Sequence, residues 1–252
     1  MMDNSPARSI ISIARIAAIA RLRLRRVLRT RILLAALVLA LLPWAVVNGA
    51  SLVARLSALA TFTVAGLTAL AAGAVGDDLE SGEYAIVMTH GATPVEVLGG
   101  QAATGLGVTA ILVALQLPIA LSGTVIPHVV PLLLCVAWLV ALLAGWLALM
   151  LLLATFLEGK ANAVAMIALF FVPLLLGAEL LDHLPRFAAV IVRAALQLLP
   201  QIDHATGMFR AILLRAPTPR IAPFVLVASP FIYFALASVR LQRLEPAGRL
   251  TQ

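Results

Sequence analysis

The chain has 252 residues, of which 63% are hydrophobic and 12% are charged, and its mean hydropathy is +1.08. Soluble domains carry about 25% charged residues, so this composition excludes an ordinary soluble protein and predicts an all-α fold of membrane-spanning helices. The net charge is +7, but the basic residues cluster at the ends of apolar stretches. That placement fits membrane topology and anionic lipid, and we expect no nucleic-acid partner.

The N-terminal segment 1–31 contains eight arginines and has a helical pattern. On a helical wheel, apolar side chains from Ile13 to Val27 share one face. Four arginines lie opposite: Arg15, Arg25, Arg26 and Arg29. We therefore predict an amphipathic elbow helix in the cytoplasmic membrane interface, with these arginines on lipid phosphates. A signal peptide fits less well, because the basic region is too long and no small-residue cleavage site follows the apolar run.

Apolar stretches long enough to span a membrane follow at about 32–47, 56–75, 102–121, 130–157, 161–178 and 221–239. The fourth is long enough to tilt or break. With the N-terminus inside, twelve Lys and Arg residues face the cytoplasm and six face outward. The six apolar stretches predict six spans in the cell (cytoplasmic) membrane. The bias in Lys and Arg predicts that both termini are cytoplasmic.

Between the second and third spans lies a hydrophilic segment, 76–100, which we call the acidic island. It has no Lys or Arg and carries Asp77, Asp78, Glu80, Glu83 and Glu96. Burying five carboxylates in a bilayer would cost on the order of 15 kcal/mol, so the island must lie in water. Thr93 followed by Pro94 predicts a helix start, with Thr93 as the N-cap and Pro94 in the first turn.

The segment 181–220, before the last span, has apolar residues at helical spacing, punctuated by Pro185, Pro200 and Pro217. We predict an extracellular hairpin of two short amphipathic helices packed at the outer face of the bundle. Such helices would cover a translocation path.

Several chemistries lack the residues they need. Lys160 is the only lysine, and no Gly lies four residues before Gly159, so the chain has no P-loop for ATP. His128, His183 and His204 all lie on the predicted outside, but an adjacent Asp-His pair does not form a chelating face, and we predict no metal site. No buried catalytic constellation is visible. We therefore predict that the chain is not an enzyme.

The island also carries a family resemblance. Asp-Asp-Leu-Glu-Ser-Gly at 77–82, the apolar patch 86–88, and then Pro94, Glu96 and Gly99-Gly100 before a span resemble the cytoplasmic loop of ABC-2 type transporter permeases. The layout of elbow helix, six spans and external hairpin is similar to that family over 1–31 and 32–252. The chain departs from the family where Thr commonly follows the Gly, where Arg follows the Pro, and where Gly-Lys enters the span.

The resemblance implies the permease subunit of an ATP-driven exporter. Two copies, or one copy and a related permease, would bind two separate P-loop ATP-binding subunits, which hold ATP and Mg. The coupling loop 76–101 would dock on the ATPase, its acids on basic residues and its apolar side chains in a cleft. The implied contacts are Asp77, Asp78, Glu80, Gly82, Glu83, Tyr84, Ile86, Val87, Met88, Pro94 and Glu96.

Two alternatives stay open at this point. Within the same class, a haem-export or cytochrome-maturation permease has a similar loop. From a different class, a membrane scaffold or assembly factor would bind a soluble partner through the same loop and transport nothing. Polar residues inside the apolar stretches, such as Gln116 and Asn162, are expected to cement helix packing rather than to line a path.

Overall fold

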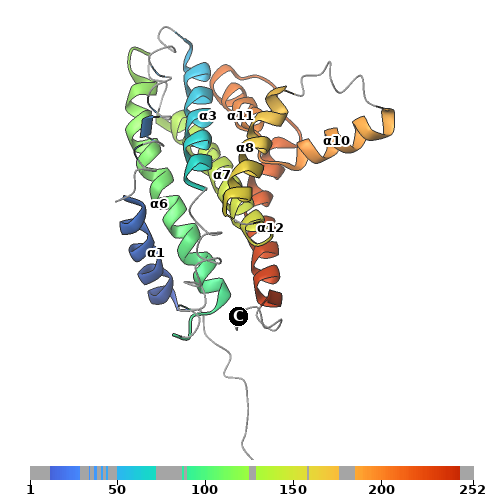
Figure 1. Cartoon of the computed structure of the whole chain (residues 1–252). Coiled ribbons are helices and arrows are strands. Elements are labelled where there is room, and N and C mark those ends of the chain that lie inside the picture. The colour runs from blue at the N-terminus through green and yellow to red at the C-terminus, as the bar shows by residue number, and fades with distance from the viewer. Residues whose placement is uncertain are drawn as a thin grey trace, which may run out of the picture.

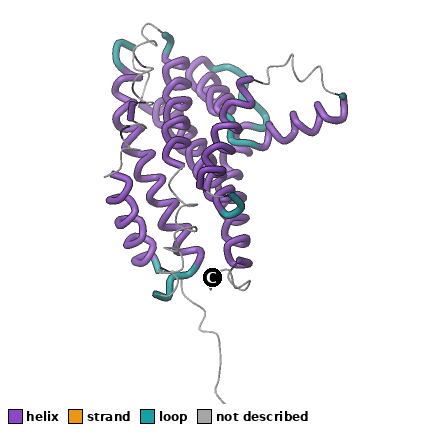
Figure 2. The backbone as a smooth tube through the Cα atoms, in the orientation of Figure 1, coloured by secondary structure: helices purple, strands orange, loops and turns teal. Residues whose placement is uncertain are grey.

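The structure is a computed structural model that describes residues 12–28, 50–71, 90–124, 129–157, 159–175 and 185–244, together with positions 34, 37, 38, 41, 44 and 87. Within these ranges all regular structure is helical (Figure 2). The helices are α1 (Ile13–Leu28), α3 (Leu52–Ala71), α6 (Pro94–Leu121), α7 (Val129–Ala154), α8 (Gly159–Leu175), α10 (Arg186–Leu198), α11 (Ile202–Leu214) and α12 (Ala222–Leu244). The all-α prediction is confirmed for the described residues.

Among the described residues, three helices are long and apolar enough to cross a membrane, namely α6, α7 and α12, so the chain is a membrane-embedded protein. Shorter apolar helices, Leu52–Thr68 within α3 and Ala161–Phe171 within α8, coincide with the predicted second and fifth spans. The predicted first span, 32–47, lies mostly outside the described residues. The fourth predicted span forms one unbroken helix, α7. A total of six spans stays a prediction.

Helix α7 is the centre of the bundle, with α3, α11 and α12 packed around it (Figure 1). Its second half is buried almost all round, which its continuous apolar sequence permits. Small residues let the helices approach closely. At Gly145 of α7, a Cβ atom would lie 2.7 Å from the Ser229 Oγ atom of α12 and 3.0 Å from Pro200, so only glycine fits there without a shift.

Helix α1 lies lengthwise against the first half of α6 on the side away from α7 (Figure 1). The two helices run parallel. Ile16 and Ile19 pack on Gly99 and Gly100, and Leu24 packs further along α6 near Val108. An amphipathic helix was expected within 1–31, and the structure has one, α1, over Ile13–Leu28. Its placement in the plane of a membrane interface stays a prediction.

The bundle has two polar ends. We call the end with the turn 90–93 and the C-terminal ends of α7 and α12 the island end, because this turn belongs to the acidic island. At the opposite end, which we call the cavity end, α3 begins and α11 packs between α3, α7 and α12. Arg55 ties this end together by donating to the backbone carbonyls of Ala50, at 3.1 Å, and Ser122.

The predicted pair of short helices before the last span is present as α10 and α11, separated by Pro200. They behave differently. Helix α11 packs into the bundle, whereas α10 projects sideways from it (Figure 1) and exposes 78% of Phe187. The expectation that both helices pack on the bundle is therefore met by α11 only. The extracellular location of both stays a prediction.

Candidate functional site

Three of the eleven predicted docking residues lie in the described part of the chain: Val87, Pro94 and Glu96. The others lie outside it: Asp77, Asp78, Glu80, Gly82, Glu83, Tyr84, Ile86 and Met88. Of the predicted lipid-facing arginines, Arg15 and Arg25 are exposed on α1, while the side chain of Arg26 and the whole of Arg29 lie outside the described residues.

Glu96 is the most tightly held of the three described residues. Its side chain is 0% exposed, and each carboxylate oxygen accepts a backbone hydrogen bond. Oε1 accepts from the Ser12 N–H at 2.6 Å, and Oε2 accepts from the Thr93 N–H at 2.8 Å. Ser12 and Glu96 are 84 residues apart in the chain. A single carboxylate therefore joins two distant segments.

Each of these segments is the start of a helix. Thr93 is the N-cap of α6, and its Oγ1 accepts from the Glu96 N–H at 3.3 Å, which completes a reciprocal capping box. Ser12 immediately precedes α1, and its Oγ accepts from the Arg15 N–H at 3.4 Å. Helix N-termini carry unpaired N–H groups and a partial positive charge. The Glu96 carboxylate accepts a hydrogen bond from one N–H group at each of the two helix starts.

Arg15 adds a second connection between α1 and the turn before α6. Its Nη1 lies 3.7 Å from the Glu96 Oε2 and also donates to the Gly91 carbonyl. Gly91 has a φ of +78°, a left-handed conformation that a side chain would strain. The turn 90–93 is therefore held from both sides, by its own glycine geometry and by α1. We call Ser12, Arg15, Gly91, Thr93 and Glu96 the Glu96 junction.

A small apolar cluster lies next to the junction. Val97 and Leu98 of α6 pack with Ala237 and Leu241 of α12, and Val87 packs against this cluster. Pro94 and Glu96 are buried, so in this structure both lie inside the protein rather than on a surface. Their assignment as direct docking contacts stays a prediction, and the structure gives Glu96 an internal partner set that sequence reasoning missed.

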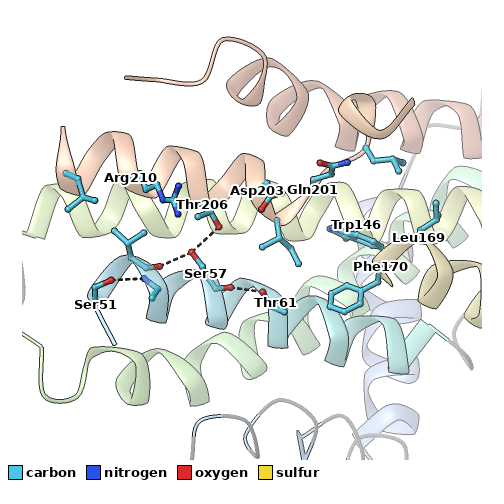
Figure 3. Close-up of a pocket in the computed structure, with 15 residues that line it drawn as sticks. Ser51, Ser57, Thr61, Trp146, Leu169, Phe170, Gln201, Asp203, Thr206 and Arg210 are labelled. Carbon is cyan, nitrogen blue, oxygen red and sulfur yellow. Dashed lines mark hydrogen bonds between the residues drawn. The ribbon is translucent and has the colours of Figure 1, made fainter. Parts of the chain in front are cut away.

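A cavity of about 590 Å³ lies at the cavity end between α3, α7, α8 and α11 (Figure 3). Ser51, Asp203 and Arg210 are exposed, whereas Trp146 and Phe170 are 4% and 8% exposed. In Figure 3 the cavity runs from Ser51 and Arg210 at one end to Trp146 and Phe170 at the other. The space thus has an open polar end and a closed aromatic end.

Hydroxyl groups line the wall between these ends. The Ser57 hydroxyl donates to the Val53 carbonyl at 2.8 Å, and the Thr61 hydroxyl donates to the Ser57 carbonyl at 2.9 Å. The Thr206 hydroxyl of α11 donates to Ser57 Oγ at 3.0 Å and joins the two helices (Figure 3). A hydroxyl has a single proton. Each of these hydroxyl groups therefore already donates its proton to a protein oxygen. Toward the cavity, its oxygen can act only as a hydrogen-bond acceptor.

The aromatic end contains a buried donor. Trp146 and Phe170 pack edge to face with ring centroids 6.4 Å apart. The buried Trp146 Nε1 has no hydrogen-bond partner among the residues that the structure describes. Buried indole N–H groups normally find an acceptor. An oxygen or nitrogen atom of a bound molecule would supply one here.

His204 lies one residue from the cavity-lining Asp203 on α11. Burial lowers the pKa of His204, and this effect outweighs the opposing effects of the Asp203 charge and of a hydrogen bond with the Leu199 backbone. The imidazole is therefore neutral at pH 7. Of the three histidines on the predicted outside, only His204 is described, and the described residues contain no group of three metal-ligating side chains.

Gln116 forms a polar cluster between α3 and α6. It is fully buried, its Oε1 accepts from the Trp44 indole N–H at 3.2 Å, and its Nε2 donates to the Thr63 hydroxyl at 3.2 Å. Gln116 does not line the cavity described above. The expectation that Gln116 cements helix packing is confirmed.

Comparison with known proteins found no family model that matches this chain, and no curated protein matches it either. The function therefore has to be argued from the residues and their arrangement.

Proposed function

We propose that this chain is the membrane permease subunit of an ATP-driven exporter of the ABC-2 type. The observation that carries the proposal is the Glu96 junction, because it links α1 and α6 at the point where the acidic island enters the bundle. Such a link would carry force from a separate ATPase into the bundle. Motion of the island would reach two helices together rather than one.

In this mechanism the island binds an ATP-binding subunit through complementary charge and apolar packing. Asp77, Asp78, Glu80 and Glu83 meet basic residues of the ATPase, and apolar side chains of the island enter a cleft between them. The apolar contacts supply affinity, and the charges set orientation and partner choice. ATP and Mg stay on the partner.

ATP-driven closure of two ATPase subunits moves the paired islands toward each other. Because Glu96 caps both helices, the start of α6 and the start of α1 move as one body. The bundle then alternates between two states whose relative populations depend on which one the closed ATPase binds better. If the predicted orientation holds, the cavity at the opposite end is on the outer side, where an outward-facing state would release its substrate.

The proposal is tested by purifying the tagged protein from its native membranes in mild detergent. We expect a P-loop ATPase to co-purify, with vanadate-sensitive ATP hydrolysis in the eluate. The double variant Glu80→Lys, Glu83→Lys reverses the charge of the island and is expected to release the ATPase. Asp203→Lys is the matched control, since it reverses an exposed carboxylate at the cavity end.

Two outcomes would contradict the proposal. If the folded protein brings down no nucleotide-binding partner, the chain is better explained as a membrane scaffold that binds another soluble protein through the island. If an ATPase co-purifies equally with the double variant and with Asp203→Lys, the island is not its docking site.

A further inference from the structure

The cavity between α3, α7, α8 and α11 has the size and lining of a small-molecule site. Ligand pockets have volumes of about 300–1,000 Å³ and combine apolar walls with a few placed polar groups. This one is about 590 Å³ and pairs the aromatic faces of Trp146 and Phe170 with hydroxyl groups on α3 and α11. A buried Trp146 N–H without a partner among the described residues indicates that the space is built for an occupant.

The hydrogen-bonding groups of the cavity wall indicate which kind of ligand fits the cavity. Ser57, Thr61 and Thr206 donate their protons to protein oxygens, so their remaining capacity toward the cavity is to accept. The exposed Asp203 carboxylate at the rim is also an acceptor. A ligand that fits this wall brings N–H or O–H donors along its polar edge.

The residues at the closed end indicate the chemistry of the rest of the ligand. Leu169, Phe170 and the Trp146 ring offer apolar surface, and the Trp146 N–H offers a single donor to an oxygen on that part of the ligand. Aromatic faces also attract cations. Arg210 stands at the open end, two helical turns from Asp203, and would repel a cation placed beside it.

We propose that this cavity binds an amphipathic amine of a few hundred daltons that carries an oxygen acceptor for the Trp146 N–H, as an amino alcohol does. Its apolar body lies against the packed Trp146 and Phe170 side chains, and its amino group lies near Asp203, where Thr61 and Thr206 accept hydrogen bonds. Binding at this site does not depend on the transporter mechanism. That the bound amine is the exported substrate rests on the proposed function.

The experiment uses three probes that share one apolar body and differ in the head group: 1-adamantylmethylamine, 1-adamantanemethanol and 1-adamantanecarboxylate. Equilibrium dialysis measures their binding to the full chain in nanodiscs, and empty nanodiscs correct for partition into lipid. We expect the amine to bind most tightly, the alcohol less tightly and the carboxylate most weakly. No ATPase subunit is needed, so failure here is distinguishable from failure of the proposed function.

Matched variants locate the site. Thr61→Val removes one hydrogen-bond acceptor from the cavity wall. It should weaken binding of the amine probe about tenfold, the effect of one lost hydrogen bond to a charged group. Thr68→Val is the control, because Thr68 lies on the same helix, donates to the carbonyl four residues earlier in the same way, and does not line the cavity. Asp203→Asn should weaken binding of the amine probe and leave binding of the alcohol probe unchanged.

Two results would overturn the proposal. Equal binding of all three probes, unchanged by Thr61→Val, would reduce the cavity to a non-selective apolar space. If the cavity instead binds the carboxylate probe most tightly, and Arg210→Gln abolishes that preference, the cavity is an anion site. Thr206→Val on α11 gives a second test of the acceptor wall if Thr61→Val fails to fold.

Discussion

At the island end a buried carboxylate has a hydrogen-bond donor on each oxygen, whereas at the cavity end a buried indole N–H has no partner among the described residues. Both groups are almost fully inaccessible to solvent. The difference separates two kinds of region. A satisfied polar group locks its surroundings, and an unsatisfied group beside a cavity leaves a place for a ligand. One chain thus holds, at opposite ends, a fully hydrogen-bonded carboxylate and a cavity beside a buried donor that is unpaired within the described part of the chain.

Removing the Glu96 carboxylate is expected to have the largest effect. Glu96→Ala leaves the Ser12 and Thr93 N–H groups without their acceptor, and we expect a loss of about 3 kcal/mol, or a Tm lowered by roughly 6–12 °C. Thermal unfolding in detergent micelles measures it. Asp203→Ala, which removes an exposed carboxylate from α11, should leave the Tm nearly unchanged. An unchanged Tm in Glu96→Ala would show that the junction locks nothing.

A methyl group at the α1–α6 contact should have the next largest effect. A Cβ at Gly100 would lie 2.5 Å from Ile19 Cγ2, so Gly100→Ala must displace α1, at about 1–2 kcal/mol. Gly107→Ala on the same helix is the control. Its Cβ would meet Leu24 at 3.9 Å, an ordinary contact, and alanine favours helix over glycine. The Tm should fall for the first variant and hold or rise for the second.

The smallest effect concerns pH at the cavity end. Burial lowers the pKa of His204, so the unfolded chain takes up a proton at higher pH than the folded chain does. The stability from neutral His204 is fully present above the unfolded pKa of about 6.5 and is lost as pH falls toward the folded pKa.

We therefore expect Tm to decline between pH 7.5 and pH 5.5, and His204→Gln to flatten the decline. Glu96→Gln should keep the decline, because that site is at the other end of the bundle. If Tm declines with the same slope in His204→Gln, another titrating group causes the decline.

Helix starts were predictable from short-range chemistry. Thr93-Pro94 indicates an N-cap and first turn, and the structure confirms both. The spacing Thr93 to Glu96 is also that of a capping box, a signal that sequence reasoning passed over when it assigned Glu96 to a partner. The two short helices around Pro200 were likewise predictable, because proline and helical spacing act within a few residues.

The partners of these helices were not predictable. Nothing near Glu96 in the sequence indicates that Ser12 would supply its second hydrogen bond, because that contact joins residues 84 positions apart. The same holds for Thr206 and Ser57, which are separated by 149 positions. An apolar helix has the same composition whether it faces lipid or protein, so periodicity alone does not assign its neighbours.

By itself, the sequence determined that this protein is helical and membrane-embedded and where α6 begins, because these properties follow from local hydrophobicity and capping. That the acidic island lies in water stays a prediction, and the structure buries one of its five carboxylates, Glu96, inside the protein. The tertiary structure decided which helices meet. It placed Glu96 between two helix starts and left a cavity beside Trp146, because both depend on packing between segments far apart in the chain.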